Sequence, residues 1–85
     1  MNDSIYYNTQ LVCGLTGARI SKVDGHAVVT IVIPNGHYTD MRGARMLACQ
    51  LAPECRRVNV EWDDGSLVNV YVGDGEVWEC IFRDH

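Results

Sequence analysis

The segment from Val58 to Phe82 constrains the fold more than any other part of this chain. It contains two Asp-Gly pairs, Asp64-Gly65 and Asp74-Gly75, and each pair separates two runs rich in β-branched and aromatic residues. An Asp-Gly pair between such runs is a strong hairpin signal, because glycine supplies the positive φ that tight turns need. The segment therefore predicts three consecutive antiparallel strands.

The pairing register of these strands decides which side chains are buried. If the loops are Asp63–Gly65 and Gly73–Gly75, each ending in a left-handed glycine, all the opposed residues are apolar. These pairs are Val60–Val68, Val58–Val70, Val70–Trp78 and Val68–Cys80. A slip by one residue would turn each strand over. The predicted buried face consists of Val58, Val60, Trp62, Val68, Val70, Val72, Trp78, Cys80 and Phe82.

Another hairpin is predicted upstream, where Asp24-Gly25 separates Ala18–Val23 from the β-branched run Ala27–Ile33. A two-residue turn of this composition takes positive φ at both positions. It opposes residues whose apolar side chains share one sheet face. The predicted pairs are Ile20–Val29 and Ala18–Ile31.

A helix is predicted between the two hairpins. Thr39 or Asp40 can cap its first turn, and the helix should run to about Ala52, because Pro53 cannot continue it. Gly43 would allow close packing on the sheet. The expected buried stripe is Met41, Ala44, Leu47, Ala48 and Leu51, with Arg42, Arg45 and Gln50 facing out.

These elements predict one domain over residues 1–85, with an α+β fold in the order β-β-α-β-β-β. About five strands form an antiparallel sheet, and the helix packs on one of its faces. Residues 1–17 are a loosely patterned lead-in, with a short strand near Leu11–Cys13.

The other face of the C-terminal strands mixes aliphatic, aromatic and acidic side chains, which is typical of a protein-binding surface. From Glu61 onward the chain has seven acidic residues and one basic residue, Arg83. Plain solvent exposure and a cover made by residues 1–17 are the alternatives. The predicted partner-binding residues are Tyr71, Glu79, Leu67, Val77, Ile81, Glu61, Asp74 and Glu76.

Motifs for catalysis, metals and cofactors do not occur in this sequence. The four cysteines include no C-x-x-C pair, and His37 has no identifiable nucleophile or carboxylate beside it. We therefore expect a non-enzymatic protein without metal or cofactor. The first ten residues lack the basic and apolar regions of a signal peptide, and no apolar run is long enough for a membrane helix. These features predict a cytoplasmic protein whose cysteines are free thiols.

The segment from Met41 to Cys80 carries a resemblance to a known family. Its helix and strands, ending in Asp74-Gly75-Glu76-Val77-Trp78-Glu79-Cys80, resemble small phage-encoded anti-CRISPR proteins, and the layout is closest to one type I-F inhibitor. The likeness covers about half of the chain. It implies a phage or mobile-element protein in the host cytoplasm that binds a CRISPR–Cas surveillance complex or nuclease stoichiometrically and blocks it.

Two further hypotheses remain open from the sequence. One is a small nucleic-acid-binding or regulatory module that uses Arg42, Arg45, Arg56 and Arg57, although a net charge of −4 favours a host protein or ribonucleoprotein partner without direct nucleic-acid contact. The other is a homodimer formed through the sheet edges Ala18–Val23 or Glu76–Phe82.

Overall fold

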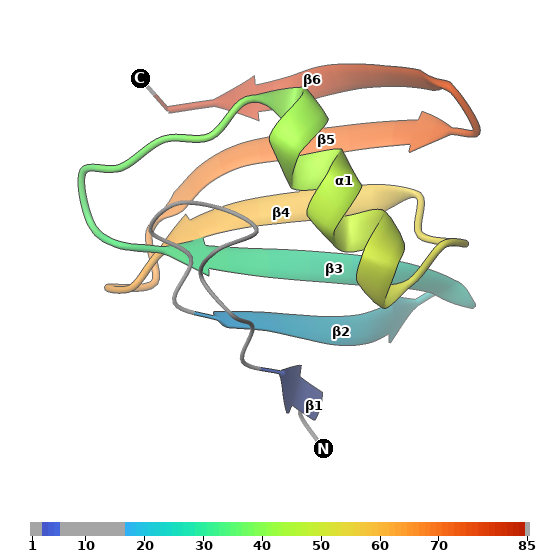
Figure 1. The fold of residues 1–85 in the computed structure, drawn as a ribbon, viewed down its shortest axis with the longest axis horizontal. Helices are drawn as coiled ribbons and strands as arrows, with labels where there is room; N and C mark the ends of the chain where they lie inside the picture. Colours follow the sequence, from blue (N-terminus) through green and yellow to red (C-terminus); the bar gives the residue numbers. More distant parts are fainter. Residues whose placement is uncertain (1–2, 6–16, 85) are drawn as a thin grey trace.

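The computed structural model describes residues 3–5 and 17–84, with side chains described from Gly17 onward. A single helix crosses one face of a twisted sheet, and the two ends of the chain lie at opposite edges of that sheet (Figure 1). The strands lie side by side in chain order. The elements are β1 (Asp3–Ile5), β2 (Gly17–Val23), β3 (His26–Ile33), α1 (Met41–Leu51), β4 (Arg57–Trp62), β5 (Leu67–Asp74) and β6 (Val77–Arg83).

The α+β fold, with its one helix and the order β-β-α-β-β-β from β2 onward, confirms the prediction. β1 adds a short strand beside β2 from within the predicted lead-in. The strand predicted near Leu11–Cys13 lies outside the described residues, as does most of the segment 1–17 that was weighed as a cover for the open face.

The β2–β3 hairpin has the predicted turn and register. Asp24 and Gly25 have φ angles of 52° and 80°, so both central residues are left-handed, as a type I′ turn requires. The predicted pairs Ile20–Val29 and Ala18–Ile31 are both present.

β3 and β4 are parallel, which corrects the prediction of a wholly antiparallel sheet. The reason is the helix between them. α1 carries the chain from one end of the sheet back to the other, so β4 begins at the same end as β3 (Figure 1). All other neighbouring strands pair antiparallel.

Helix α1 matches its prediction at both ends. Asp40 caps it by accepting a hydrogen bond from the Gly43 N–H at 2.7 Å, and Ala52 is the C-cap. A Cβ on Gly43 would meet atoms of this cap and not the sheet, so its expected sheet-packing role is wrong. The predicted stripe packs on the sheet: Ala44, Leu47 and Ala48 are buried, and Met41 and Leu51 are partly buried.

The β4–β5 turn is the predicted three-residue loop, but the register beyond it is not the predicted one. Gly65 is left-handed, with φ of 93°, and the Trp62 N–H donates to the Ser66 carbonyl. A bulge then shifts the pairing between Val60 and Glu61. The resulting pairs are Glu61–Leu67, Val60–Asn69 and Val58–Tyr71, in place of Val60–Val68 and Val58–Val70.

The β5–β6 turn also differs from the prediction. Asp74 pairs with Val77, so the loop has two residues, Gly75 and Glu76, with Gly75 left-handed at φ of 67°. A second bulge lies on β6, because Tyr71 pairs with Cys80 and Val70 with Phe82. Because of the two-residue loop, Trp78 faces Gly73, and the predicted pairs Val70–Trp78 and Val68–Cys80 are wrong.

These bulges redistribute the side chains between the two faces. Tyr71 joins the core under the helix with 2% of its surface exposed, which corrects its predicted place on the open face. Phe82, predicted to be buried, is 41% exposed and lies with Val70 and Val72 on the face opposite the helix. Val58, Val60, Val68, Trp62, Trp78 and Cys80 pack in or against the core, as predicted.

Candidate functional site

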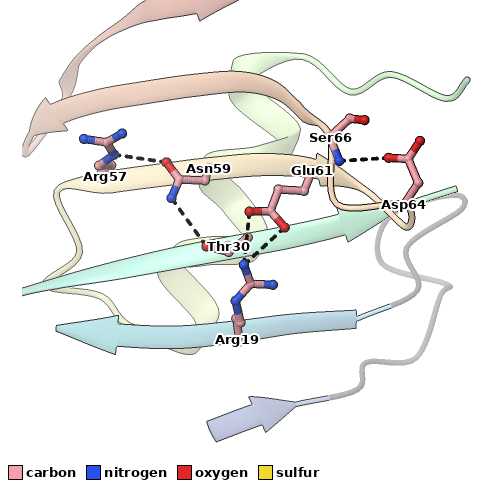
Figure 2. Close-up of polar contacts among 7 residues, drawn as sticks. All are labelled: Arg19, Thr30, Arg57, Asn59, Glu61, Asp64 and Ser66. Carbon is pink, nitrogen blue, oxygen red and sulfur yellow. Dashed lines mark hydrogen bonds and ion pairs between the residues drawn. The ribbon is translucent and has the colours of Figure 1, made fainter. Parts of the chain in front are cut away.

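The open face, opposite α1, carries a chain of polar contacts across β2, β3 and β4 (Figure 2). One guanidinium nitrogen of Arg19 contacts both carboxylate oxygens of Glu61, at 3.0 and 3.1 Å, and this ion pair spans β3. Beside it, Asn59 donates to the Thr30 hydroxyl at 3.4 Å and accepts from the Arg57 Nε–H at 3.0 Å. These polar side chains thus bind one another.

Glu61 was predicted to bind a partner, but the structure places it in this internal network. Its carboxylate is partly buried beside Arg19, and a partner would have to replace that ion pair. An ion pair this exposed contributes at most about 1 kcal/mol to stability. Because the polar side chains of this network already hydrogen-bond to one another, a partner at the β2–β4 part of the open face would have to replace those bonds.

The β6 edge of the sheet is different, because it displays apolar side chains. Val77 is 80% exposed, Ile81 53% and Phe82 41%. We call these three residues the β6 stripe. Val77 and Phe82 share the open face by register, and Ile81 is the extra residue of the bulge. Isolated exposed apolar residues are ordinary, but three on one edge strand of so small a domain make that strand the candidate for an interaction surface.

Acidic residues surround the β6 stripe. Asp74 precedes the β5–β6 loop and Glu76 lies within it. Glu79 lies within β6 and Asp84 follows it, and all four are exposed. We call these four residues the acidic rim. Arg83 is the basic residue of β6. An apolar strip edged with one sign of charge suits a partner surface of the opposite sign.

The β5–β6 turn is fastened to the helix by Trp78 and Arg45. The Arg45 guanidinium lies 5.0 Å from the Trp78 ring centroid, and both side chains donate hydrogen bonds to the Gly75 carbonyl, at 3.3 and 2.9 Å. Arg45 therefore does not simply face solvent, which corrects its predicted orientation. These contacts hold the start of β6 in a defined position.

Tyr71 lies on the helix side of the sheet, beside a shallow hollow of about 320 Å³ at the start of α1. Its hydroxyl donates to the Thr39 carbonyl at 3.3 Å, and burial raises the pKa of this phenol above its usual value. Neighbouring Asn69 is buried as well; its amide nitrogen lies 4.0 Å from the Cys80 sulfur, and its Oδ1 has no hydrogen-bond partner in the described part of the chain. Tyr71 is therefore a core residue that also lines this hollow.

Six of the eight predicted partner-binding residues are exposed, with Leu67 at the opposite end of β5 from Asp74 and the β5–β6 turn. Glu61 and Tyr71 are engaged elsewhere, and Phe82 was missed because the bulge that exposes it has no clear mark in the sequence. The six lie exposed along β5, β6 and their turn: Leu67, Asp74, Glu76, Val77, Glu79 and Ile81.

Arg42 and Arg45 of the nucleic-acid hypothesis line one hollow on α1, but the other two arginines lie elsewhere. Arg45 lies over Trp78, and Arg57 is bonded to Asn59 on the open face. Arg42 is exposed on α1, and Arg56 is exposed just before β4. This arrangement lacks the continuous basic groove that tracks a nucleic-acid backbone.

The cysteines give no metal site among residues 3–5 and 17–84, where no cluster of three or more His, Cys, Asp or Glu side chains could hold an ion. Cys49, Cys55 and Cys80 are free thiols. Burial, and secondarily the nearby Cys49, raise the pKa of the Cys55 thiol to about 11. Cys55 is therefore protonated at neutral pH and is a poor nucleophile.

Comparison of the chain with models of protein families, with curated proteins and with solved structures finds no match in any of the three. Within the described residues, no helix is long and apolar enough to cross a membrane. Function must therefore be inferred from the side chains of the β6 edge.

Proposed function

We propose that this chain is a small, non-enzymatic phage or mobile-element protein that inhibits a host defence complex by stoichiometric binding through the β6 stripe and the acidic rim. The observation that carries the proposal is the exposure of Val77, Ile81 and Phe82 along one edge strand. The resemblance of residues 41–80 to anti-CRISPR proteins suggests the partner, a CRISPR–Cas surveillance complex or nuclease of the host cytoplasm.

Inhibition by binding agrees with the chemistry of the surface. Apolar side chains at the centre of a contact supply most of its affinity, and the charged rim speeds encounter with a partner of opposite charge. CRISPR effectors carry positively charged channels for nucleic acid. An acidic protein that occupies such a channel would block DNA recognition without any catalytic group.

The test is a phage-plating assay in hosts with an active CRISPR–Cas system, tried type by type, together with binding to the purified effector. Wild-type protein should restore plating and bind at a ratio of one per effector site. Ile81→Arg should abolish both. Val23→Arg is a matched control, because Val23 is 54% exposed but lies at the β2–β3 turn. Equal activity of Ile81→Arg and wild type would refute this surface, and failure to bind any effector would refute the partner class.

A further inference from the structure

β6 is the last strand of the sheet, and one of its two edges is not paired with another described strand (Figure 1). Asp74 and Val77 close a two-residue loop and so form the hydrogen-bonded pair nearest the turn. Hydrogen-bonded and non-hydrogen-bonded pairs alternate along an antiparallel ladder. Trp78 and Cys80 fall in the non-hydrogen-bonded pairs, so their backbone N–H and C=O groups point away from β5.

This edge carries some of the devices that protect edge strands, namely the bulge at Ile81 and the charged side chains of Glu79 and Arg83. Proline and lysine, which commonly block strand pairing, do not occur in β6. The bulge at Ile81 interrupts the edge, but it leaves Val77–Cys80 regular. The contacts of Arg45 and Trp78 with Gly75 also fix the start of the strand, so pairing with it would cost little ordering entropy.

The negative charge of the acidic rim favours some pairing strands over others. A second copy of this chain would bring its own acidic rim against Asp74, Glu76, Glu79 and Asp84, and like charges in contact are destabilising. An extended segment with lysine or arginine at alternate positions would instead place positive charge against this rim. Because the side chains of a strand alternate between the two faces of a sheet, its intervening apolar side chains would lie on the helix side, beside Trp78 and Cys80.

We infer that β6 binds its partner by strand addition, and that the partner contributes an extended, basic segment that pairs with the backbone of Val77–Cys80. The inference rests on the proposed function for its biological setting, but not for its test. Backbone hydrogen bonds would supply affinity, and the alternating side chains would supply specificity.

The experiment uses the full chain and three synthetic nine-residue peptides with blocked ends. One alternates lysine and valine, one alternates glutamate and valine, and the third is the lysine peptide with alternate backbone amides N-methylated. Binding is followed by ¹H–¹⁵N NMR and amide hydrogen exchange. The lysine peptide should bind with a dissociation constant below about 1 mM, protect the Trp78 and Cys80 amides from exchange, and weaken as salt is added. The other two peptides should not bind there.

Two charge-reversal variants distinguish an effect of charge at this site from an effect of the net charge of the protein. Glu79→Lys should weaken the lysine peptide at least about 5-fold, whereas Asp63→Lys, which changes net charge equally at the β4–β5 turn, should have little effect. The inference would be overturned if the lysine peptide did not bind, if the N-methylated peptide bound equally well, or if the perturbed amide resonances lay away from β6. Concentration-dependent protection of the same amides without peptide would overturn it in favour of a homodimer. Inhibition of a CRISPR effector without this peptide response would leave the proposed function standing and remove only strand addition.

Discussion

Replacement of Gly73 by alanine tests the β5–β6 register most directly. Gly73 lies opposite Trp78, and a Cβ placed on Gly73 would overlap both the indole ring of Trp78 and the carbonyl oxygen of Val77. Normal contact between such atoms needs roughly 3.5–4.0 Å. The indole must therefore move, and the strand must shift with it.

The expected loss can be estimated from the contacts involved. Overpacking of this kind costs about 1–3 kcal/mol. Displacement of Trp78 also removes its hydrogen bond to Gly75 and its contact with Arg45, each contributing roughly 1 kcal/mol. The alanine restricts the unfolded chain, which returns about 0.4–1 kcal/mol. Gly73→Ala should therefore lower the free energy of unfolding by about 2–4 kcal/mol.

Urea denaturation followed by circular dichroism measures this loss, and the indole N–H resonance of Trp78 reports its displacement. Gly43→Ala is the control, because Gly43 lies in the helix where alanine is preferred and its neighbours are the side-chain oxygens of Thr39 and Asp40. It should stay within about 1 kcal/mol of wild type. A Gly73→Ala protein as stable as wild type, with an unmoved Trp78 resonance, would refute the observed register.

Three further predictions follow from single contacts. Tyr71→Phe removes the hydrogen bond to the Thr39 carbonyl and should lower the free energy of unfolding by about 0.5–1.5 kcal/mol in urea denaturation; no change would show that this hydroxyl is solvated. Asp40→Ala removes the cap on the Gly43 N–H and should lower it by about 1 kcal/mol, with Asp40→Asn retaining most of the stability. Because the pKa of Cys55 is raised from 9.0 to about 11, its thiolate fraction at pH 8 is roughly a hundredfold below that of an unperturbed thiol. Iodoacetamide should therefore label Cys55 far more slowly in the folded protein than in urea, as read by mass spectrometry. The same shift makes stability fall as pH rises from about 9 to about 11, and Cys55→Ala should remove that part of the pH dependence.

Most of the fold could be predicted from local chemistry. The turn at Asp24-Gly25 and the helix from its Asp40 cap to Pro53 each depend on residues close in sequence, and both predictions are confirmed. The three-residue loop ending at Gly65 is confirmed for the same reason. Short-range signals of this kind act through backbone φ preferences and capping hydrogen bonds, which depend on the residue types at a few adjacent positions.

The register of β4–β6 could not be predicted in the same way. Matching apolar residues across the strands favoured Val70 opposite Trp78, but the β5–β6 loop is Gly75-Glu76, which places Trp78 opposite Gly73. Bulges then let an extra residue enter one strand and change the pairs beyond them. The buried Asn69 shows that apolar matching is not what decides this pairing. The glycine at position 73 was the available signal, because a large aromatic side chain can pack over a residue that has no Cβ.

The predicted exposure of the β6 residues is correct, although the register used to predict it is wrong. Val77, Glu79 and Ile81 are exposed because β6 is an edge strand, whichever residues of β5 they face. Tyr71 was misplaced because a single step in pairing moves a β5 side chain to the other face of the sheet, which brought Tyr71 to the helix side and Val70 to the opposite face. Surface predictions are thus most secure at edges and least secure on strands beneath a helix.

The sequential order of the strands has a consequence for how the chain folds. Within the described sheet, turns connect the strands of the β2–β3, β4–β5 and β5–β6 pairs, and residues 6–16 connect β1 to β2. β3 and β4 are connected instead by the crossover that contains α1. The turn-connected hairpins can close rapidly, whereas β3 and β4 meet only after the 34–56 crossover has been closed. We therefore expect the folding transition state to contain the β3–α1–β4 unit. Substitutions at Ala48 or Val58 should slow folding, whereas those at Trp78 should chiefly speed unfolding.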